Sequence, residues 1–304
     1  MKVLSRTTTA ALQGLAILLI ICCHFIGGGY GIRYLTPFGG IGVAIFLFVS
    51  GYGLAESNKA KGIEHFWEKK VVRILIPYLL WLPFYWIILK FVPLNCSLSY
   101  PFPRYWYLEF LFLFYAVYWI FAKWLPKYTV FSLVCVGLVS FFVFPCLQAE
   151  QSFSFLLGVV ASEYKNRFQK TIEKRYLLYV LVLFVSGVLL LAAKQMPQIR
   201  SFGENSLVMK LVQIIMKSSF ALSLVIMINL IVESNSIDWL VKLLSVLGAY
   251  SLEAYMVQMT FLTSINHIWM KLLLFLFITI VVSVIIHYLS KLLSNVIKNS
   301  IKAS

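Results

Sequence analysis

Long runs of apolar residues, spread over the whole chain, restrict the possible folds of this sequence more than any other feature. A transmembrane helix needs about 20 predominantly apolar residues to cross the hydrocarbon core of a bilayer. Runs that reach or approach this length lie near residues 10–27, 37–56, 73–93, 105–124, 128–147, 151–164, 176–194, 207–232, 243–265 and 271–290. Because 61% of the 304 residues are hydrophobic and only 12% are charged, no class of soluble fold fits. The sequence therefore predicts an all-α protein, a polytopic membrane bundle of about ten transmembrane helices.

The Lys and Arg residues cluster in the short segments between these runs. They number 26 against 11 Asp and Glu residues, which gives a net charge of +15. In a soluble protein such an excess would suggest a nucleic-acid partner, but in a membrane protein it indicates orientation, because cytoplasmic loops are enriched in Lys and Arg. Placing the N-terminus inside puts most of these residues on the cytoplasmic side. We therefore expect both termini in the cytoplasm, contact with membrane lipid and no nucleic-acid partner.

No linker, repeat or low-complexity segment divides the chain, so we expect a single membrane domain over residues 1–304. Its start, MKVLSRTTTAALQGLAILLIICC, has the basic end and apolar run of a signal peptide. Many further runs follow, however, which favours a first transmembrane helix instead. The five cysteines show no metal-binding spacing, and no metal site is expected.

Two polar residues stand in the first apolar run, ALQGLAILLIICCHF. Gln13 and His24 are 11 residues apart, about three helical turns, so a regular helix places them on one face. Ionisable side chains inside a span are candidates for function, because lipid does not solvate them. His24 is therefore a candidate functional residue, although a histidine that only bonds a neighbouring helix would also fit the pattern.

Four further ionisable residues lie in or near the apolar runs. Glu253 is in a span with small residues that permit close helix approach, and a buried carboxylate there needs a partner, for function or for packing. Glu109 could face a site or lie at the wet outer interface. Lys217 is expected to pair with a carboxylate rather than to bind a substrate anion. His287, near the end of the last span, is expected to extend to the membrane interface.

A basic cluster precedes the third run, in HFWEKKVVRILIPY. Lys69, Lys70 and Arg73 are spaced so that they lie on adjacent faces of one helix. Such a cluster could hold the phosphate groups of a cytoplasmic ligand. Without further information, the ordinary belt of positive charge that contacts anionic lipid is the favoured interpretation.

Taken together and in order, these segments resemble the acyltransferase-3 family of integral membrane acyltransferases. The resemblance covers nearly the whole chain, and it rests on six segments: ALQGLAILLIICCHF, GGIGVAIFLFVSGYGL, FWEKKVVRILIPYLLW, YWYLEFLFLFY, FSFLLGVVASEY and LGAYSLEAYMVQ. It implies a plasma-membrane (inner-membrane) O-acyltransferase with no permanently bound cofactor. The implied co-substrate is cytoplasmic acyl-CoA, most often acetyl-CoA, and the implied acceptor is a hydroxyl of a cell-surface or lipid-linked glycan.

The chain departs from the family pattern at three positions. Family members carry an arginine and a histidine in the first span, and here the histidine is His24 but the arginine position is Gln13. Lys70 and Arg73 fill a second basic pair, with Lys in place of an arginine. A histidine near the end of the late span is here Gln258. Glutamine still donates a hydrogen bond but supplies no charge, and lysine lacks the bidentate fork of arginine.

The resemblance, together with the chemistry of acyl transfer, suggests a role for each candidate. His24 would be the general base, since neutral imidazole can accept a hydroxyl proton near pH 7, with Glu253 or Glu109 orienting it. The acyl-CoA would be held by the basic cluster and by the residue at the arginine position: Lys69, Lys70, Arg73 and Gln13. Two alternatives stay open, a transporter of lipid-linked sugars and a non-catalytic relative that binds CoA or glycan. The absence of an inverted repeat disfavours the transporter.

Overall fold

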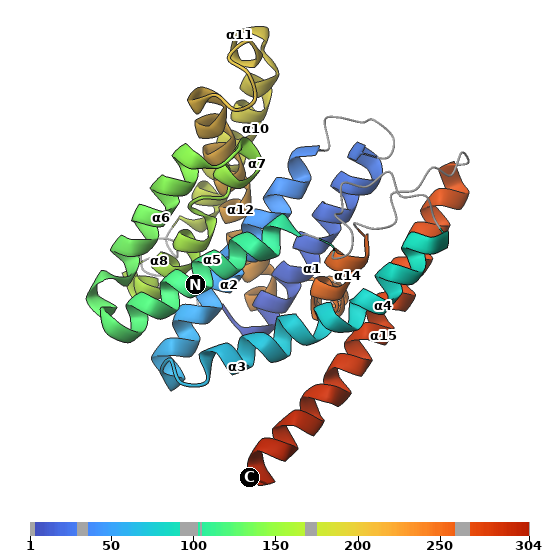
Figure 1. The fold of residues 1–304 in the computed structure, drawn as a ribbon. Helices are drawn as coiled ribbons and strands as arrows, with labels where there is room; N and C mark the ends of the chain where they lie inside the picture. The colour runs from blue at the N-terminus through green and yellow to red at the C-terminus, as the bar shows by residue number, and fades with distance from the viewer. Residues whose placement is uncertain are drawn as a thin grey trace.

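A computed structural model describes residues 4–28, 36–91, 103, 105–167, 175–258 and 268–303, and every regular element in them is helical. The helices are α1 (Arg6–Cys22) with the π-helical segment η1 (Cys23–Gly28), α2 (Thr36–Lys61), α3 (Phe66–Lys70) with the π-helical segment η3 (Val71–Leu75), α4 (Ile76–Phe91), α5 (Trp106–Trp124), η4 (Pro126–Tyr128), α6 (Thr129–Val143), α7 (Cys146–Ala149), α8 (Ser154–Glu163), α10 (Tyr176–Gln195), α11 (Pro197–Arg200), α12 (Leu207–Ser234), α13 (Asp238–Ala249), α14 (Ser251–Gln258) and α15 (Ile268–Ala303). Figure 1 shows them gathered into one bundle.

Eight of the described helices or continuous helical segments are long and apolar enough to cross a membrane, and a ninth span is formed if α13 and α14 are counted together. The prediction of an all-α polytopic bundle is therefore confirmed. Two predicted spans differ from expectation. The run 151–164 forms α8, whose 10 residues rise about 15 Å and do not cross a bilayer alone. The run 243–265 is bent by 62° between α13 and α14, and its last residues lie outside the described part.

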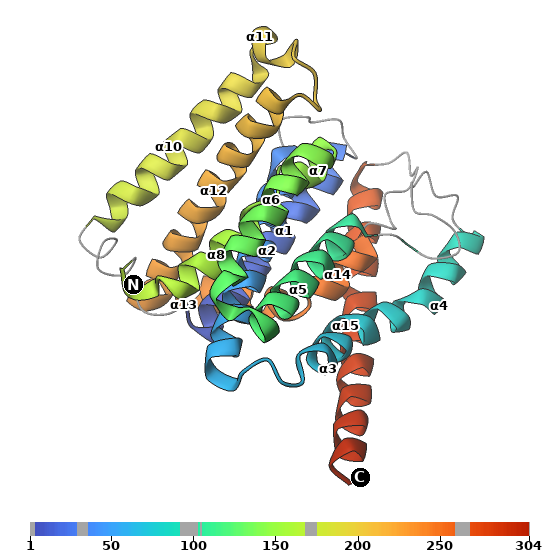
Figure 2. The same ribbon diagram turned by 60° about the vertical axis from the view of Figure 1, so that its left-hand side comes forward.

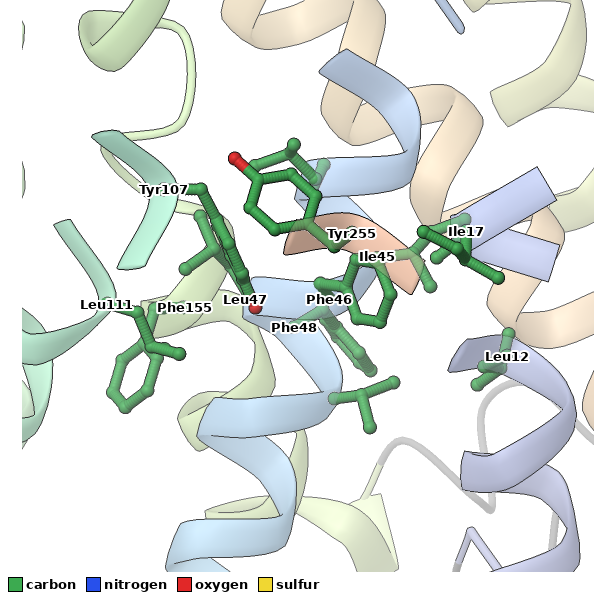
Figure 3. Close-up of a cluster of buried hydrophobic side chains, with 14 of the residues drawn as sticks. Leu12, Ile17, Ile45, Phe46, Leu47, Phe48, Tyr107, Leu111, Phe155 and Tyr255 are labelled. Atoms are coloured by element: carbon green, nitrogen blue, oxygen red, sulfur yellow. The ribbon is translucent and has the colours of Figure 1, made fainter. Parts of the chain in front are cut away.

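The helix α2 forms the centre of the bundle. It packs against α1, α8 and α12, and Figure 3 shows its side chains meeting those of α1, α5, α8 and α14 in the core. Small residues allow the closest of these contacts, since a Cβ atom at Gly51 would overlap the carbonyl oxygen of Phe155 on α8. In the same way, Gly14 of α1 lies against the backbone of α13 at Leu244.

The outer helices expose apolar side chains, as a lipid-facing surface requires. The clearest example is α10, of which only a small share is buried and which packs mainly against α12. Figure 2 shows α10 and α12 side by side at the edge of the bundle, joined through α11. At the end of the bundle opposite to α11, α15 extends beyond the other helices (Figure 1). We call this the basic end, because α2 ends there and the basic helix α3 begins.

Candidate functional site

A cavity of about 710 Å³ opens at the basic end of the bundle, between α1, α2, α3 with η3, α5, α14 and α15. Its volume lies within the range of small-molecule sites. All four residues predicted to bind the acyl-CoA line it: Gln13, Lys69, Lys70 and Arg73. The structure thus brings the basic cluster and the first helix to one concave surface, which their separation in the sequence did not require.

The three cations of the cluster have different surroundings. The Lys70 ammonium lies 3.8 Å from the centre of the Tyr115 ring, a cation–π contact with a cavity wall residue. Lys69 donates a hydrogen bond of 3.2 Å to the Glu64 carbonyl oxygen. Arg73 is exposed at the cavity, within the π-helical segment η3. Lys70 is therefore held against the wall, while Lys69 and Arg73 lie at accessible positions.

Glu253 and His287 form a hydrogen-bonded pair in the cavity wall. Oε1 of Glu253 lies 3.0 Å from Nδ1 of His287, and the two side chains are 5% and 35% exposed. The Tyr250 ring packs edge-on against the imidazole at 4.7 Å between centroids. The expectation that His287 extends to the membrane interface stays a prediction, and the structure adds that the buried carboxylate of Glu253 holds its imidazole in the cavity wall. One interpretation of the sequence paired Glu253 with His24. In the structure the partner of Glu253 is His287.

The sequence carried a signal for the inward orientation of His287. Ser283 and Ser290 lie four residues before it and three after it, a spacing that places all three on one side of a helix. The structure buries both serines on the inner side of α15. A polar side of this kind in an otherwise apolar span indicates contact with the bundle rather than with lipid.

His24 lies in η1, immediately after α1 changes from an α-helix to a π-helix. The Gln258 amide lies next to its imidazole, but the geometry between them is not that of a hydrogen bond. Among the described residues, neither His24 Nδ1 nor either polar atom of the Gln258 side chain has a hydrogen-bond partner. Gln258 is fully buried. Two residues that the family resemblance singled out are therefore neighbours, with unused hydrogen-bonding capacity.

The distance from the cavity to His24 can be estimated from the rise per residue along α1 and along α14. Gln13 lines the cavity and His24 does not, and their separation of 11 residues corresponds to about 16 Å along the axis. On α14, Glu253 lies at the cavity and Gln258 lies beside His24, about 7.5 Å further along the axis. The π-helical start at Cys23 also shifts His24 relative to the face expected for a regular helix.

The remaining predicted residues lie apart from this arrangement. Lys217 forms an ion pair with Glu150, and both side chains are buried, which confirms the expected pairing with a carboxylate. Glu109 is exposed in the first turn of α5, and its role in orienting His24 stays a prediction. Within the described residues, no group of three or more His, Cys, Asp or Glu side chains could hold a metal ion.

Comparison with known proteins supports the family resemblance. The model of the acyltransferase-3 family, described as an acyltransferase domain, matches residues 10–290. Comparisons with curated proteins and with solved structures give no match. The matched region contains most of the residues that line the cavity, together with the basic cluster, His24 and Gln258, and it covers most of the chain. The chain therefore belongs to the acyltransferase-3 family and is a membrane acyltransferase.

Proposed function

We propose that this protein is an O-acetyltransferase that moves an acetyl group from acetyl-CoA in the cytoplasm to a hydroxyl of a cell-surface or lipid-linked glycan. The observation that carries the proposal is the cavity at the basic end, with Lys69, Lys70 and Arg73 in its wall. The enrichment of Lys and Arg at this end supports a cytoplasmic location for it and for both termini, in the plasma membrane.

The basic cluster suits the phosphate groups of the donor. Arg73 can offer two parallel N–H donors to a phosphate, and Lys69 and Lys70 supply point charges. Glu253, the carboxylate in the same wall, is paired with His287, so its repulsion of a phosphate is reduced. Gln13 adds a hydrogen-bonding group but no charge. The cavity therefore favours an anionic ligand, with the nucleotide end of CoA near η3.

His24 is the proposed general base. Its imidazole takes the proton of the acceptor hydroxyl while the hydroxyl oxygen attacks the thioester carbonyl carbon. The carbon–sulfur bond then breaks, the acetyl ester remains on the acceptor, and the proton passes to the CoA thiolate, which leaves as the thiol. A general base contributes about 10²–10⁴-fold in rate. The buried amide of Gln258 lies beside His24 and is placed to orient one of the reacting groups.

Labelled acetyl transfer tests the proposal. Membranes from cells that express the protein are incubated with [¹⁴C]acetyl-CoA, and label in the glycan fraction is measured against membranes without it. We expect incorporation with the wild-type protein and a loss of at least about 100-fold with His24→Ala. His65→Asn is the matched control, because His65 is exposed outside the cavity at φ 53°, a conformation that Asn tolerates.

Each alternative gives a different result. Wild-type incorporation by His24→Ala would contradict the role of His24. Equal label with and without the protein would contradict the O-acetyltransferase. Movement of lipid-linked sugar without covalent change would instead indicate a transporter, a class in which broken helices such as α13–α14 also occur.

A further inference from the structure

Three buried hydroxyl groups on α15 have no hydrogen-bond partner within the described structure. They belong to Thr279, Ser283 and Ser290, which are 3%, 2% and 7% exposed. Their spacing of four and seven residues places them on one side of the helix, the side that packs against α14 and α4. We call these three residues the polar row.

Unpaired hydroxyls are unusual in such a position. A buried hydroxyl without a partner destabilises the protein, and a helical serine or threonine can usually bond a backbone carbonyl of the preceding turn. Several other helical serines of this protein do so, although Ser140 and Ser245 do not: Ser294, on the same helix, donates to the Ser290 carbonyl oxygen at 2.6 Å, and Ser223 on α12 donates to that of Phe220 at 2.8 Å. The polar row therefore keeps hydrogen-bonding capacity that its neighbours use locally.

The polar row connects the cavity with His24. At one end, Ser290 lines the cavity beside the Glu253–His287 pair. At the other end, Phe275 lies one turn beyond Thr279 and its ring packs 5.1 Å from that of Phe25, the residue after His24. From Ser290 to Phe275 the helix rises about 22 Å.

The facing helix α14 carries an independent observation of the same kind. Its Glu253 pairs with His287, which fixes the level of α14 against α15. Gln258, five residues further along, then lies about level with the segment between Thr279 and Ser283. Its amide is fully buried and also without a partner among the described residues. Unpaired hydroxyls thus lie along the inner side of α15, and the unpaired amide of Gln258 lies beside His24.

We propose that the polar row and Gln258 bind the amide-bearing arm of the acyl-CoA donor and guide its thioester from the cavity to His24. This inference rests on the proposed function, since it assumes that the nucleotide end lies at the basic cluster. The pantetheine arm is a long, thin chain with two amides and a hydroxyl, so it can satisfy a line of buried polar atoms. A fatty acyl chain would leave these polar atoms without hydrogen-bond partners. A sugar ring is too wide to enter between two packed helices.

The arm requires α14 and α15 to separate slightly. The cavity reaches Ser290 and His287, whereas Ser283 and Thr279 lie beyond its lining residues. The element that yields is α14, because it meets α13 at a bend of 62°. Unpaired hydroxyls along the contact lower the free energy required to open it, because they gain partners when the arm enters.

The test compares two ligands that share the nucleotide but differ in the arm. Binding of acetyl-CoA and of adenosine 3′,5′-bisphosphate, which has no arm, is measured with the full-length protein in lipid nanodiscs. The variants are Thr279→Val, which keeps the shape of the side chain, and Ser283→Ala. We expect each to weaken acetyl-CoA binding by about 2- to 10-fold and to leave the bisphosphate unchanged.

A second measurement separates binding from folding. Because the hydroxyls are unpaired without ligand, their removal should leave the melting temperature of the free protein unchanged or raise it. The control is Ser223→Ala, which removes a paired hydroxyl on α12 and should lower the melting temperature while leaving both affinities intact.

The outcomes distinguish this inference from the proposed function. If the wild-type protein binds neither ligand, the proposed function is overturned and the inference with it. If it binds both, and the polar-row variants bind acetyl-CoA as tightly as the wild type or lose both ligands equally, the inference alone is overturned.

Discussion

Oε1 of Glu253 and Nδ1 of His287 lie 3.0 Å apart and join α14 to α15 in the wall of the cavity. A carboxylate only accepts hydrogen bonds, so Nδ1 carries the proton of this contact. The other ring nitrogen, Nε2, is then free to accept when the imidazole is neutral. Glu253 is the one buried carboxylate among the residues that line the cavity, so this contact gives it the hydrogen-bond partner that a buried carboxylate needs.

Removing His287 should destabilise the protein, because Glu253 would remain buried without its partner. Breaking a fully buried pair costs about 3–5 kcal/mol, and we expect about 1–3 kcal/mol for His287→Ala since the imidazole is partly exposed. Adding Glu253→Gln should restore most of the loss. The free energy of unfolding in detergent micelles, measured for both single variants and the double variant, checks this coupling. Additive losses would show that the pair contributes nothing to stability.

Filling the cavity should block the donor without disturbing the fold. A Cβ atom at Gly53 meets no atom within 4 Å, and this residue lines the cavity. We expect Gly53→Leu to weaken acetyl-CoA binding by at least about tenfold, because its side chain occupies space proposed for the donor. Calorimetric titration measures the affinity, and the melting temperature should not fall, since leucine favours the helix more than glycine does.

Gly51, two residues earlier on α2, gives the matched control. A Cβ there would overlap the Phe155 carbonyl oxygen, so Gly51→Ala should lower stability by about 1–3 kcal/mol while the folded protein keeps its affinity. Full acetyl-CoA affinity in Gly53→Leu would place the donor elsewhere.

Loss of a single cation from the cluster should weaken donor binding in a salt-dependent way. A charge-assisted hydrogen bond contributes about 1.5–3 kcal/mol, so we expect Arg73→Gln to raise the dissociation constant of acetyl-CoA about 10- to 100-fold. The salt dependence of the affinity should become shallower. Lys242→Gln removes an exposed cation paired with Asp238, outside the cavity, and should change neither quantity. Equal effects of both variants would indicate a general surface charge effect.

Restoring the family arginine should strengthen donor binding. Gln13 lines the cavity that also holds the basic cluster, and Gln13→Arg adds a positive charge there. We expect tighter binding of acetyl-CoA, more so at low salt, because charges at this range are screened by ions. Titration of the variant at two salt concentrations measures the change. Weaker binding would show that position 13 contacts an uncharged part of the ligand, or that the basic cluster repels the added arginine.

The sequence predicted the membrane spans well where hydrophobic length alone determines them. It did not predict the break between α13 and α14, because a run of apolar residues has the same mean hydropathy whether the helix is straight or bent. It also predicted a membrane span at residues 151–164, where the structure has the short helix α8 packed on α2. Burial by other helices requires apolar residues as a bilayer does, so composition does not distinguish the two.

The candidate site was predictable only residue by residue. The spacing within HFWEKKVVRILIPY placed Lys69, Lys70 and Arg73 together, and the structure confirms that they share one cavity. The neighbours of His24 and Glu253 were not predictable in this way, because periodicity indicates which face of a helix is buried but not which helix covers it. Gln258 became a neighbour of His24, and His287 a partner of Glu253, only through the packing of α14 against α1 and α15.

The glycine contacts between α1 and α13 determine how the broken span can move. Gly14 lies against the backbone at Leu244, and Gly248 lies against the backbone at Ala10, so the two helices interlock at two points. We therefore expect α13 to move together with α1, the helix that leads into the segment with His24. A rotation of α14 about the bend at Tyr250 would then change the distance between Gln258 and His24, because His24 would stay with α1 and α13.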